Sequence, residues 1–275
     1  MNNHEKKIIE QSRNYTVVKS NKLALNSRYK YSIGQQKMIA YICSKIRPAD
    51  EKNNGDYQLE YEFEIVDYIN LLGNERTGEA YNEIKKTLQD LRDKSCWIYD
   101  EKTGDEVLVA WLSKVRTNKK SGHVFYRLDE DLVPYLFELK EKYLSYGLYN
   151  ILNFRSKYSI RFYEMLKAHY DLRRSQYRKK RYETPMIEWE LEIDKLRHML
   201  MLDTDEDKNK YKNFKDFRKY VIEAAQREIN TFSNMYFTFE AITKGRKTVK
   251  VKFLVQFKDI AERIESEIRN NERFL

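Results

Sequence analysis

The chain has 275 residues, of which 41% are hydrophobic, 14% aromatic and 35% charged, which is too apolar for a disordered protein and enough to fill two hydrophobic cores. Lysine and arginine outnumber aspartate and glutamate by 52 to 43, so the formal net charge is +9 and the balance favours a polyanionic partner such as a nucleic acid. A basic soluble protein without such a partner is the alternative.

The chain is predicted to begin with a flexible segment and two helices. Residues 1–14 are polar and we expect them to form the flexible N-terminus. Residues 19–27 favour a short helix. A longer helix is predicted over 32–46, where apolar side chains such as Ile39 and Cys43 recur every three to four residues.

A strand is predicted over residues 57–64, because apolar side chains alternate there with acidic ones. The apolar residues are Leu59, Tyr61 and Phe63, and the acidic residues are Glu60, Glu62 and Glu64. One face of this strand should therefore be buried and the other wet. We interpret the glutamates as a solvated face rather than as metal ligands.

Two more helices follow the strand. The first covers Ile65 to Leu72 and is ended by Gly73 at the usual stop position. Thr77 is a suitable N-cap for the second helix, which has one apolar stripe. The stripe consists of Ala80, Ile84, Leu88 and Leu91.

A hairpin with a basic tip completes the first half. Its strands are predicted over 106–116 and 123–128, and the tip over 117–122 contains Lys119 and Lys120. Such a tip is suited to contact with a phosphate backbone.

The same order of elements returns further along the chain. Helices are predicted over 158–173, 193–202 and 213–231, and strands over 186–191, 235–242 and 249–257. A polar insert at 203–212 has no counterpart in the first half. Ile260, Ile264 and Ile268 continue at helical spacing into a charged tail.

Two local matches support an internal duplication. Tyr31-Ser32-Ile33 is repeated by Tyr158-Ser159-Ile160 at an offset of 127 residues. The acidic strand beginning at Glu60 is matched by the one beginning at Glu188, at an offset of 128. Chance similarity between amphipathic segments is the alternative, but the shared order and offset favour two copies of one fold.

Each half therefore has two helices joined by a turn and then a two-stranded hairpin. This is the winged helix-turn-helix arrangement, so the predicted fold class is α+β with two tandem winged-helix domains. We place the N-terminal domain at 15–128, a linker helix over 129–146 that ends at Gly147, the C-terminal domain at 147–258 and a helical tail at 259–275.

The helix over 213–231 is the predicted recognition helix, and Asn213 is a suitable N-cap for it with Asp216 three residues later. One face carries apolar side chains such as Phe217 and Val221, and the other is basic. The predicted DNA contacts on this helix are Lys215, Arg218, Lys219, Gln226 and Arg227, with Gln226 able to read adenine. A solvated amphipathic helix is the competing interpretation.

Further candidate contacts lie in three basic segments. The wing of the second half contributes Lys244, Arg246 and Lys247, the loop at 173–181 contributes Arg178, Lys179 and Lys180, and the first half contributes Lys85, Lys86, Lys119 and Lys120. Acidic residues accompany the basic ones on the helix of the first half. This half is therefore the predicted dimerisation domain, with an exposed strand edge and only auxiliary DNA contacts.

Signatures of catalysis are missing from the sequence. There is no Gly-rich phosphate loop, and the histidines at 4, 123, 169 and 198 are scattered without metal-ligand spacing. We therefore expect no enzymatic activity, no metal and no cofactor. Cys43 and Cys96 are typical of core residues in a reducing cytoplasm, and no apolar run is long enough to cross a membrane.

The chain resembles the iteron-binding plasmid replication initiators, over about residues 14–258. The segment from Tyr158 to Lys167 is similar to the family's "YSIRLYELLK", and the segments Phe214–Lys219 and Ala225–Asn230 also match. Leu132–Leu136 resembles the inter-domain helix of the family.

This resemblance implies binding to direct repeats at a plasmid origin, help in opening it, and recruitment of the host initiator and helicase machinery. It also implies a monomer in equilibrium with a homodimer, formed through the N-terminal domain, that represses its own gene. A double winged-helix transcriptional regulator is the main alternative, and a nicking initiator is disfavoured by the scattered histidines.

Overall fold

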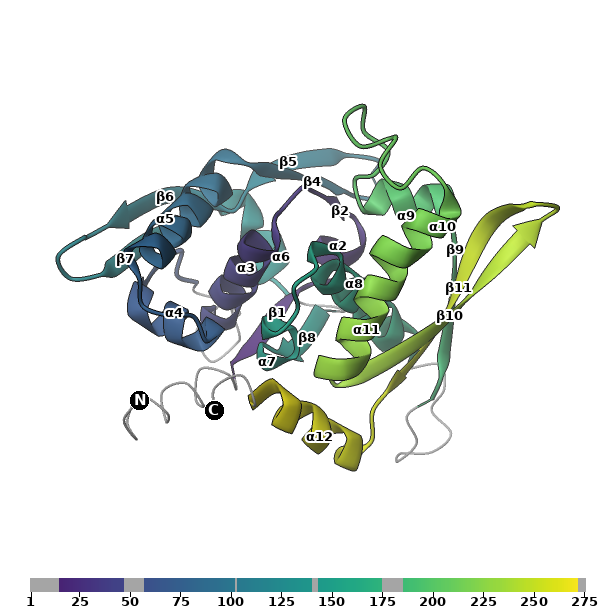
Figure 1. Cartoon of the computed structure of the whole chain (residues 1–275). Coiled ribbons are helices and arrows are strands. Elements are labelled where there is room, and N and C mark those ends of the chain that lie inside the picture. Colours follow the sequence, from purple (N-terminus) through teal and green to yellow (C-terminus); the bar gives the residue numbers. More distant parts are fainter. Residues whose placement is uncertain (1–14, 47–56, 102, 140–142, 175–184, 272–275) are drawn as a thin grey trace.

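The computed structural model describes residues 15–46, 57–101, 103–139, 143–174 and 185–271. Two similar halves lie side by side, and the long helices α5 (Gly78–Asp93) and α11 (Glu223–Phe232) lie on the same face of the molecule (Figure 1). The predicted flexible stretch at 1–14 and the candidate contacts Arg178, Lys179 and Lys180 lie outside the described residues.

The first half places its helices against two small sheets. In chain order its elements are β1 (Thr16–Ser20), α2 (Asn21–Leu25), β2 (Ser27–Arg28), α3 (Ile33–Lys45), β3 (Glu60–Glu64), α4 (Ile65–Leu72), α5, β4 (Ser95–Tyr99), β5 (Glu106–Ala110), β6 (Leu112–Thr117) and β7 (His123–Leu128). The sheets have the strand orders β2-β4-β5 and β3-β7-β6, and all their pairs are antiparallel.

The second half repeats this plan with one sheet. Its elements are α8 (Lys157–Arg174), β9 (Ile187–Glu192), α9 (Ile193–Met199), α10 (Phe214–Phe217), the π-helical segment η4 (Arg218–Ile222), α11, β10 (Met235–Lys244) and β11 (Lys247–Phe257). The strand order is β10-β11-β9. The tail helix α12 (Ile260–Asn271) follows as expected.

Several local predictions are confirmed at the helix ends. The Thr77 hydroxyl accepts a hydrogen bond from the backbone N–H of Ala80 at 3.1 Å, and Gly73 ends α4 with φ of 68°. The Asn213 side chain accepts from the N–H of Asp216 at 2.8 Å, so it caps α10. These caps satisfy backbone groups that a helix end leaves unpaired.

The predicted linker helix over 129–146 is wrong. The segment forms a 3-10 turn η2 (Glu130–Leu132), the single turn α6 (Val133–Leu136) and, after residues that the structure does not describe, strand β8 (Tyr143–Gly147). β8 pairs antiparallel with β1, from Thr16 opposite Gly147 to Ser20 opposite Tyr143. A distant strand therefore determines the conformation of this segment, and its local pattern does not.

The predicted strand over 106–116 is also incorrect, because it is two strands. β5 ends at Ala110 and β6 begins at Leu112, and between them Trp111 turns its side chain into the core, 3% exposed. β5 pairs with β4 while β6 pairs with β7, so the break lets one segment join two different sheets.

Helix α8 joins the two halves through buried polar contacts. The Lys19 ammonium on β1 lies 2.7 Å from the Glu164 carboxylate on α8, and the Tyr146 hydroxyl on β8 donates to the same oxygen at 2.6 Å. The Arg161 guanidinium donates to the carbonyl oxygens of Ser27 and Leu23. Because these groups are buried, they depend on partners from both halves.

The tail helix α12 docks through polar side chains rather than apolar ones. Asn270 donates to the Phe232 carbonyl at 2.7 Å, and the Lys258 ammonium donates to Ser266 Oγ at 2.8 Å. The isoleucines at 260, 264 and 268 are 77%, 52% and 55% exposed. The helical spacing of these isoleucines is thus real, but their stripe faces outward.

Candidate nucleic-acid interface

The candidate recognition helix consists of α10, η4 and α11 in succession. Its buried residues are Phe217, Val221, Ile222, Ala225 and Ile229, none more than 1% exposed. Lys215, Arg218, Lys219 and Arg227 are exposed. The helix therefore presents a basic surface, although its middle turn is π-helical rather than α-helical.

Within this surface the basic side chains have different neighbours. Arg218 Nε donates to Glu223 Oε1 at 2.7 Å, and its guanidinium lies 5.6 Å from the ring centre of Phe239. Among the described residues, Lys215 and Lys219 have no acidic partner, and the Lys219 ammonium lies 5.0 Å from the Tyr220 ring. Both lysines are therefore available for a phosphate or a base edge.

Gln226 has a structural contact that its predicted role did not include. Its amide nitrogen donates to the Phe237 carbonyl of β10 at 3.0 Å, and Asn230 donates to the same oxygen at the same distance. These two side chains tie the recognition helix to the wing. Reading adenine with Gln226 would require breaking its bond to Phe237.

The wing of the second half is a long antiparallel hairpin. β10 and β11 pair from Met235 opposite Phe257 to Lys244 opposite Lys247, and the hairpin extends away from the body of the molecule (Figure 1). Gly245 at the tip has φ of 62°, a conformation that favours glycine. The turn thereby exposes the three predicted contacts Lys244, Arg246 and Lys247 together.

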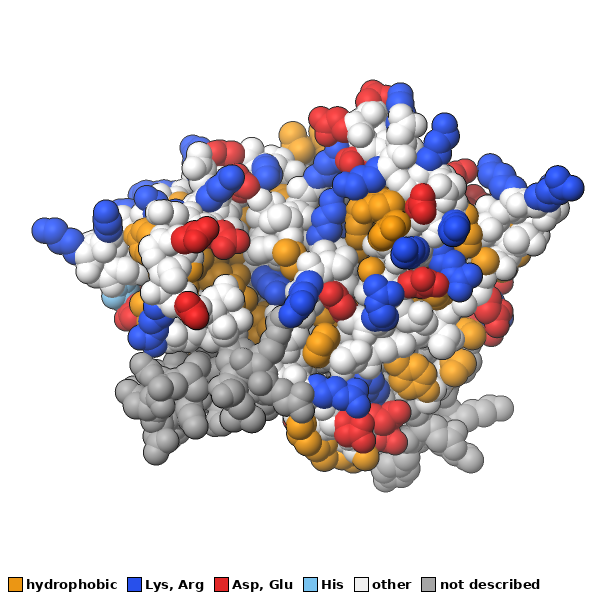
Figure 2. Space-filling view, in the orientation of Figure 1, with side chains coloured by type: hydrophobic (Ala, Val, Ile, Leu, Met, Phe, Trp, Pro, Cys, Tyr) orange, Lys and Arg blue, Asp and Glu red, His pale blue; other side chains and the backbone are white. Residues whose placement is uncertain are grey.

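The first half offers a smaller version of the same surface. Lys85 and Lys86 are exposed on α5, opposite the buried Ile84 and Leu88. Lys119 and Lys120 lie at the tip of the β6–β7 hairpin, where Asn118 Oδ1 accepts from the backbone N–H of Lys120. Figure 2 shows lysine and arginine side chains at both wing tips, at opposite ends of this face.

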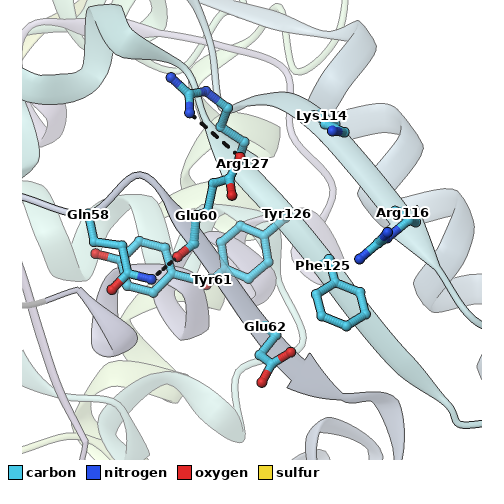
Figure 3. A pocket seen from close by; sticks show the side chains of 9 residues that line it. All are labelled: Gln58, Glu60, Tyr61, Glu62, Lys114, Arg116, Phe125, Tyr126 and Arg127. Carbon is cyan, nitrogen blue, oxygen red and sulfur yellow. Dashed lines mark hydrogen bonds and ion pairs between the residues drawn. The ribbon is translucent and has the colours of Figure 1, made fainter.

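A pocket of about 350 Å³ lies on the outer face of the β3-β7-β6 sheet (Figure 3). Its charged side chains have both signs. Arg116 lies 4.4 Å from the Phe125 ring, and Arg127 is 3.6 Å from Glu60. The glutamates at 60, 62 and 64 are exposed as expected. Because its charges compensate one another, this face is a weaker nucleic-acid surface than the recognition helix.

Neither cysteine is suited to catalysis. Burial raises the pKa of the Cys43 thiol to about 12 and that of Cys96 to about 11, so both stay protonated at neutral pH. In the described part of the chain, no group of three or more histidine, cysteine or acidic side chains could hold a metal ion. No helix among the described residues is long and apolar enough to cross a membrane.

Three further basic residues gather between the halves and were not predicted. They are Lys30, Lys157 and Lys210. Lys30 lies 2.7 Å from Asp207 and lines a hollow with it and Lys157, and the Lys210 backbone N–H donates to the Asp207 carbonyl at 2.8 Å. Their sequence signal was weak, because the acidic residues of the 203–212 insert mask its lysines. Only the folded chain brings Lys30 and Lys157 to that insert.

Two helix-turn-helix units, each followed by a basic hairpin, define a double winged-helix DNA-binding protein. Comparison with known proteins agrees. The chain belongs to the initiator replication protein family, whose WH1 model matches residues 16–167 and whose WH2 model matches residues 192–255. The predicted family and the predicted pair of winged-helix domains are thus confirmed, and the chain is a plasmid replication initiator.

Three individual proteins are similar to this chain. A replication initiation protein of Escherichia coli is 26% identical over 256 residues, which is 93% of this chain and 74% of the relative. The crystal structure of Pi initiator protein in complex with iteron DNA is similar with a TM-score of 0.68 at 17% identity, over 90% of this chain and 99% of the other. Domains 2 and 3 of RctB give a TM-score of 0.45 at 9% identity, over 83% and 85% of the two chains.

Proposed function

We propose that this protein starts plasmid replication by binding direct repeats, or iterons, at the origin. The observation that carries the proposal is the basic, exposed side of α10, η4 and α11 next to the long basic wing. A similar fold has been solved as Pi initiator protein in complex with iteron DNA, which supports the choice of ligand. The protein acts in the bacterial cytoplasm, where plasmid DNA is found.

In this proposal the second half provides most of the sequence recognition. Lys215 and Lys219 approach the major groove, while Arg246 and Lys247 of the wing contact the backbone. The first half adds contacts through α5 and its shorter wing. Several monomers on adjacent repeats then help to open the origin and recruit the host initiator and helicase, without any nuclease or nucleotide hydrolysis by this chain.

The test is binding to DNA that flanks the encoding gene. Fluorescence anisotropy with a duplex containing one direct repeat should give tighter binding than a scrambled duplex at about 150 mM salt. Lys219→Ala should reduce the preference, while Lys195→Ala, an exposed lysine on α9, serves as the matched control. Equal affinity for both duplexes would refute iteron recognition.

We also propose that the first half forms a homodimer through the β2-β4-β5 sheet. Its outer face exposes Trp97, Tyr99 and Leu108, which are 42%, 40% and 51% exposed, and Trp97 pairs directly with Leu108. β5 is an edge strand, so its free backbone groups can pair with a second β5. The β3 edge, with its three glutamates, would bring like charges together and is the weaker candidate.

The dimer suits autorepression, because a two-fold assembly matches an inverted repeat and monomers match direct repeats. Leu108→Asp should shift the equilibrium to monomer in sedimentation velocity and leave binding to a single repeat intact. Glu62→Lys, on the β3 edge, is the control. The full chain is needed here, since removing residues 1–128 would uncover the buried Arg161 and Glu164.

A transcriptional regulator is the second candidate function, supported by the same helices and wings. The two functions differ in where the protein acts. An initiator allows an origin fragment with the encoding gene to replicate in a host, and a regulator only changes transcription from a promoter. Incubation with supercoiled origin DNA and magnesium or manganese should give no nicked product, because the sequence lacks the His-x-His metal pair that a tyrosine nucleophile for strand nicking would need.

A further inference from the structure

The polar insert at 203–212 bridges the two halves. Arg28 Nη2 lies 3.1 Å from Asp203 Oδ1, and the Lys30 ammonium lies 2.7 Å from both Glu206 and Asp207. Arg28 and Lys30 belong to the first half, and the insert joins α9 to α10 in the second. The turn of the second helix-turn-helix is thus also a contact with the other half.

Arg197 fixes the shape of the insert. Its guanidinium donates to the carbonyl oxygens of Tyr211, Leu202 and Lys210 at 2.9, 3.0 and 3.1 Å. Tyr211 has φ of 54° and its ring stacks on Tyr220 of the recognition helix, with centroids 5.8 Å apart. The insert is therefore held both by α9 and by the recognition helix.

Three lysines lie near one carboxylate at this junction. The Lys30 ammonium is 2.7 Å from Asp207 and lines a small hollow together with Lys157 and Asp207, and the Lys210 backbone N–H donates to the Asp207 carbonyl at 2.8 Å. Hydrogen bonding to Lys30 lowers the pKa of the Asp207 carboxyl, and the charges of Lys210 and Lys157 act in the same direction. Burial lowers the pKa of Lys157, and the nearby Lys210 and Lys30 lower it further. Glu206 also pairs with Lys30. The cluster therefore has three positive charges and two negative ones.

The cluster lies between the two long helices. Lys157 is at the start of α8, where the preceding Ser156 N–H donates to Glu228 of α11 at 3.2 Å. On the other side, Gln36 of α3 donates to the Lys157 carbonyl at 3.0 Å. α3 lies against α5, since Gln35 donates to Asp90 at 2.5 Å. Figure 2 shows lysine and arginine side chains in this region between the halves.

We propose that Lys30, Lys157 and Lys210 form a third DNA contact, a phosphate clamp at the junction, and that Asp207 is its internal counterion in the free protein. This inference rests on the proposed binding of both halves to one duplex. A backbone running between two major-groove contacts, about 34 Å apart, has a negative charge every ~1.7 Å of axis and must pass the junction. A phosphate there takes the place of Asp207 as the negative charge beside the three lysines.

The competing explanation is that the cluster only holds the two halves together. Replacing Asp207 distinguishes the two explanations, because they predict opposite changes in DNA affinity. If the cluster is a clamp, Asp207→Asn frees the lysines and tightens binding to DNA severalfold. If the cluster only holds the halves together, the same change loosens them and weakens binding. Asp205→Asn, which removes the same charge from the outer part of the insert beside Lys208, is the matched control.

The lysines give a second, independent measurement. Lys157→Ala and Lys210→Ala should each reduce the slope of log K against log salt by about 0.9, on repeat and scrambled duplexes alike, because a phosphate contact carries no sequence information. Lys208→Ala, whose ammonium is already paired with Asp205 at 3.0 Å, should change the slope less. Unfolding curves confirm that each variant is folded.

A duplex with single methylphosphonate substitutions locates the contact. Neutralising the phosphates midway between the two grooves should weaken binding by the wild-type protein more than binding by Lys210→Ala, which has already lost one of the contacts. An unchanged salt slope in both lysine variants, or weaker binding by Asp207→Asn, overturns the clamp while DNA binding itself stands. If the wild-type protein binds neither duplex, the clamp and the proposed function both fall.

Discussion

The long helices of the two halves differ in their surfaces although both bury one apolar stripe. α5 is an uninterrupted helix with Lys85 and Lys86 among acidic neighbours, and its wing strands have six residues each. The second recognition helix contains a π-helical turn and follows a structured insert, and its wing strands have 10 and 11 residues. The two copies share a core plan and differ mainly in their connections and outer side chains.

This difference teaches how a duplicated fold can divide its tasks. The buried positions of both halves must keep their shape, so they leave little freedom for new contacts. Turns and hairpins can lengthen at little thermodynamic cost, since loop closure depends weakly on length. In the second half the longer wing extends the basic surface and the insert contacts the other half, while the first half keeps a shorter wing and an exposed apolar sheet.

The largest effect is expected where the halves meet. Glu164→Leu leaves the Lys19 ammonium and the Tyr146 hydroxyl buried without their partner, so the free energy of unfolding should fall by about 3–5 kcal/mol. Adding Lys19→Met removes the uncompensated charge and should restore most of the loss. Urea unfolding measures both changes, and a loss below about 1 kcal/mol in the single variant would contradict a shared core.

The same experiment shows whether the halves unfold together. Trp111 lies in the first half and Trp189 in the second. One variant keeps only Trp111 and another keeps only Trp189, and Trp97 is replaced by Phe in both. With one tryptophan left in each variant, the two transitions should coincide, because α8 belongs to both cores. Separate midpoints would show that the halves are independent.

The next effect concerns the two recognition helices. Lys219→Ala should reduce the affinity for a single repeat by about 1–3 kcal/mol if its ammonium reaches a base edge. Lys86→Ala in the first half should cost clearly less, because acidic side chains accompany it on α5. Anisotropy titrations at one salt concentration compare them, and equal losses would remove the distinction between a main and an auxiliary domain.

The wings should differ more modestly. Replacing Arg246 and Lys247 by alanine should weaken binding to all duplexes evenly and lower the salt slope by about 0.9 for each lost phosphate contact. The pair Lys119 and Lys120 should change the slope less, since their hairpin is shorter. A change in sequence preference in the first variant would mean that this wing reads bases.

The smallest effect is expected at the wing tips. Gly245→Ala forces an L side chain into a left-handed conformation and should cost about 1 kcal/mol of stability, as should Gly122→Ala with φ of 72°. Gly78→Ala, at the start of α5 with open space around it, should instead stabilise by about 0.4–1 kcal/mol. Thermal unfolding of the three variants checks the signs.

Features that depend on local chemistry were predictable from the sequence. The Thr77 and Asn213 caps, the Gly73 stop and the alternation in β3 all follow from interactions within a few residues. The fold class followed from their order and repetition. The basic face of the second recognition helix was also visible, because helical spacing fixes which side chains share a face.

Features that depend on distant partners were not predictable. β8 looked helical because Val133–Leu136 before it is helical, and its true partner β1 lies near the start of the chain. The bond from Gln226 to Phe237 needs the wing to fold back on the helix. The junction cluster joins Lys30 to Asp207 across most of the chain, and no spacing rule predicts such a contact.

The pairing of Lys19 with Glu164 also sets an order of events during synthesis. A ribosome adding ~5–20 residues per second needs roughly 7–29 s to extend the chain from the first of these residues to the second. During that interval β1 is finished, but β8 and α8, which complete its surroundings, do not yet exist. The core around β1 therefore closes only after β8 and α8, at the start of the second half, have left the ribosome.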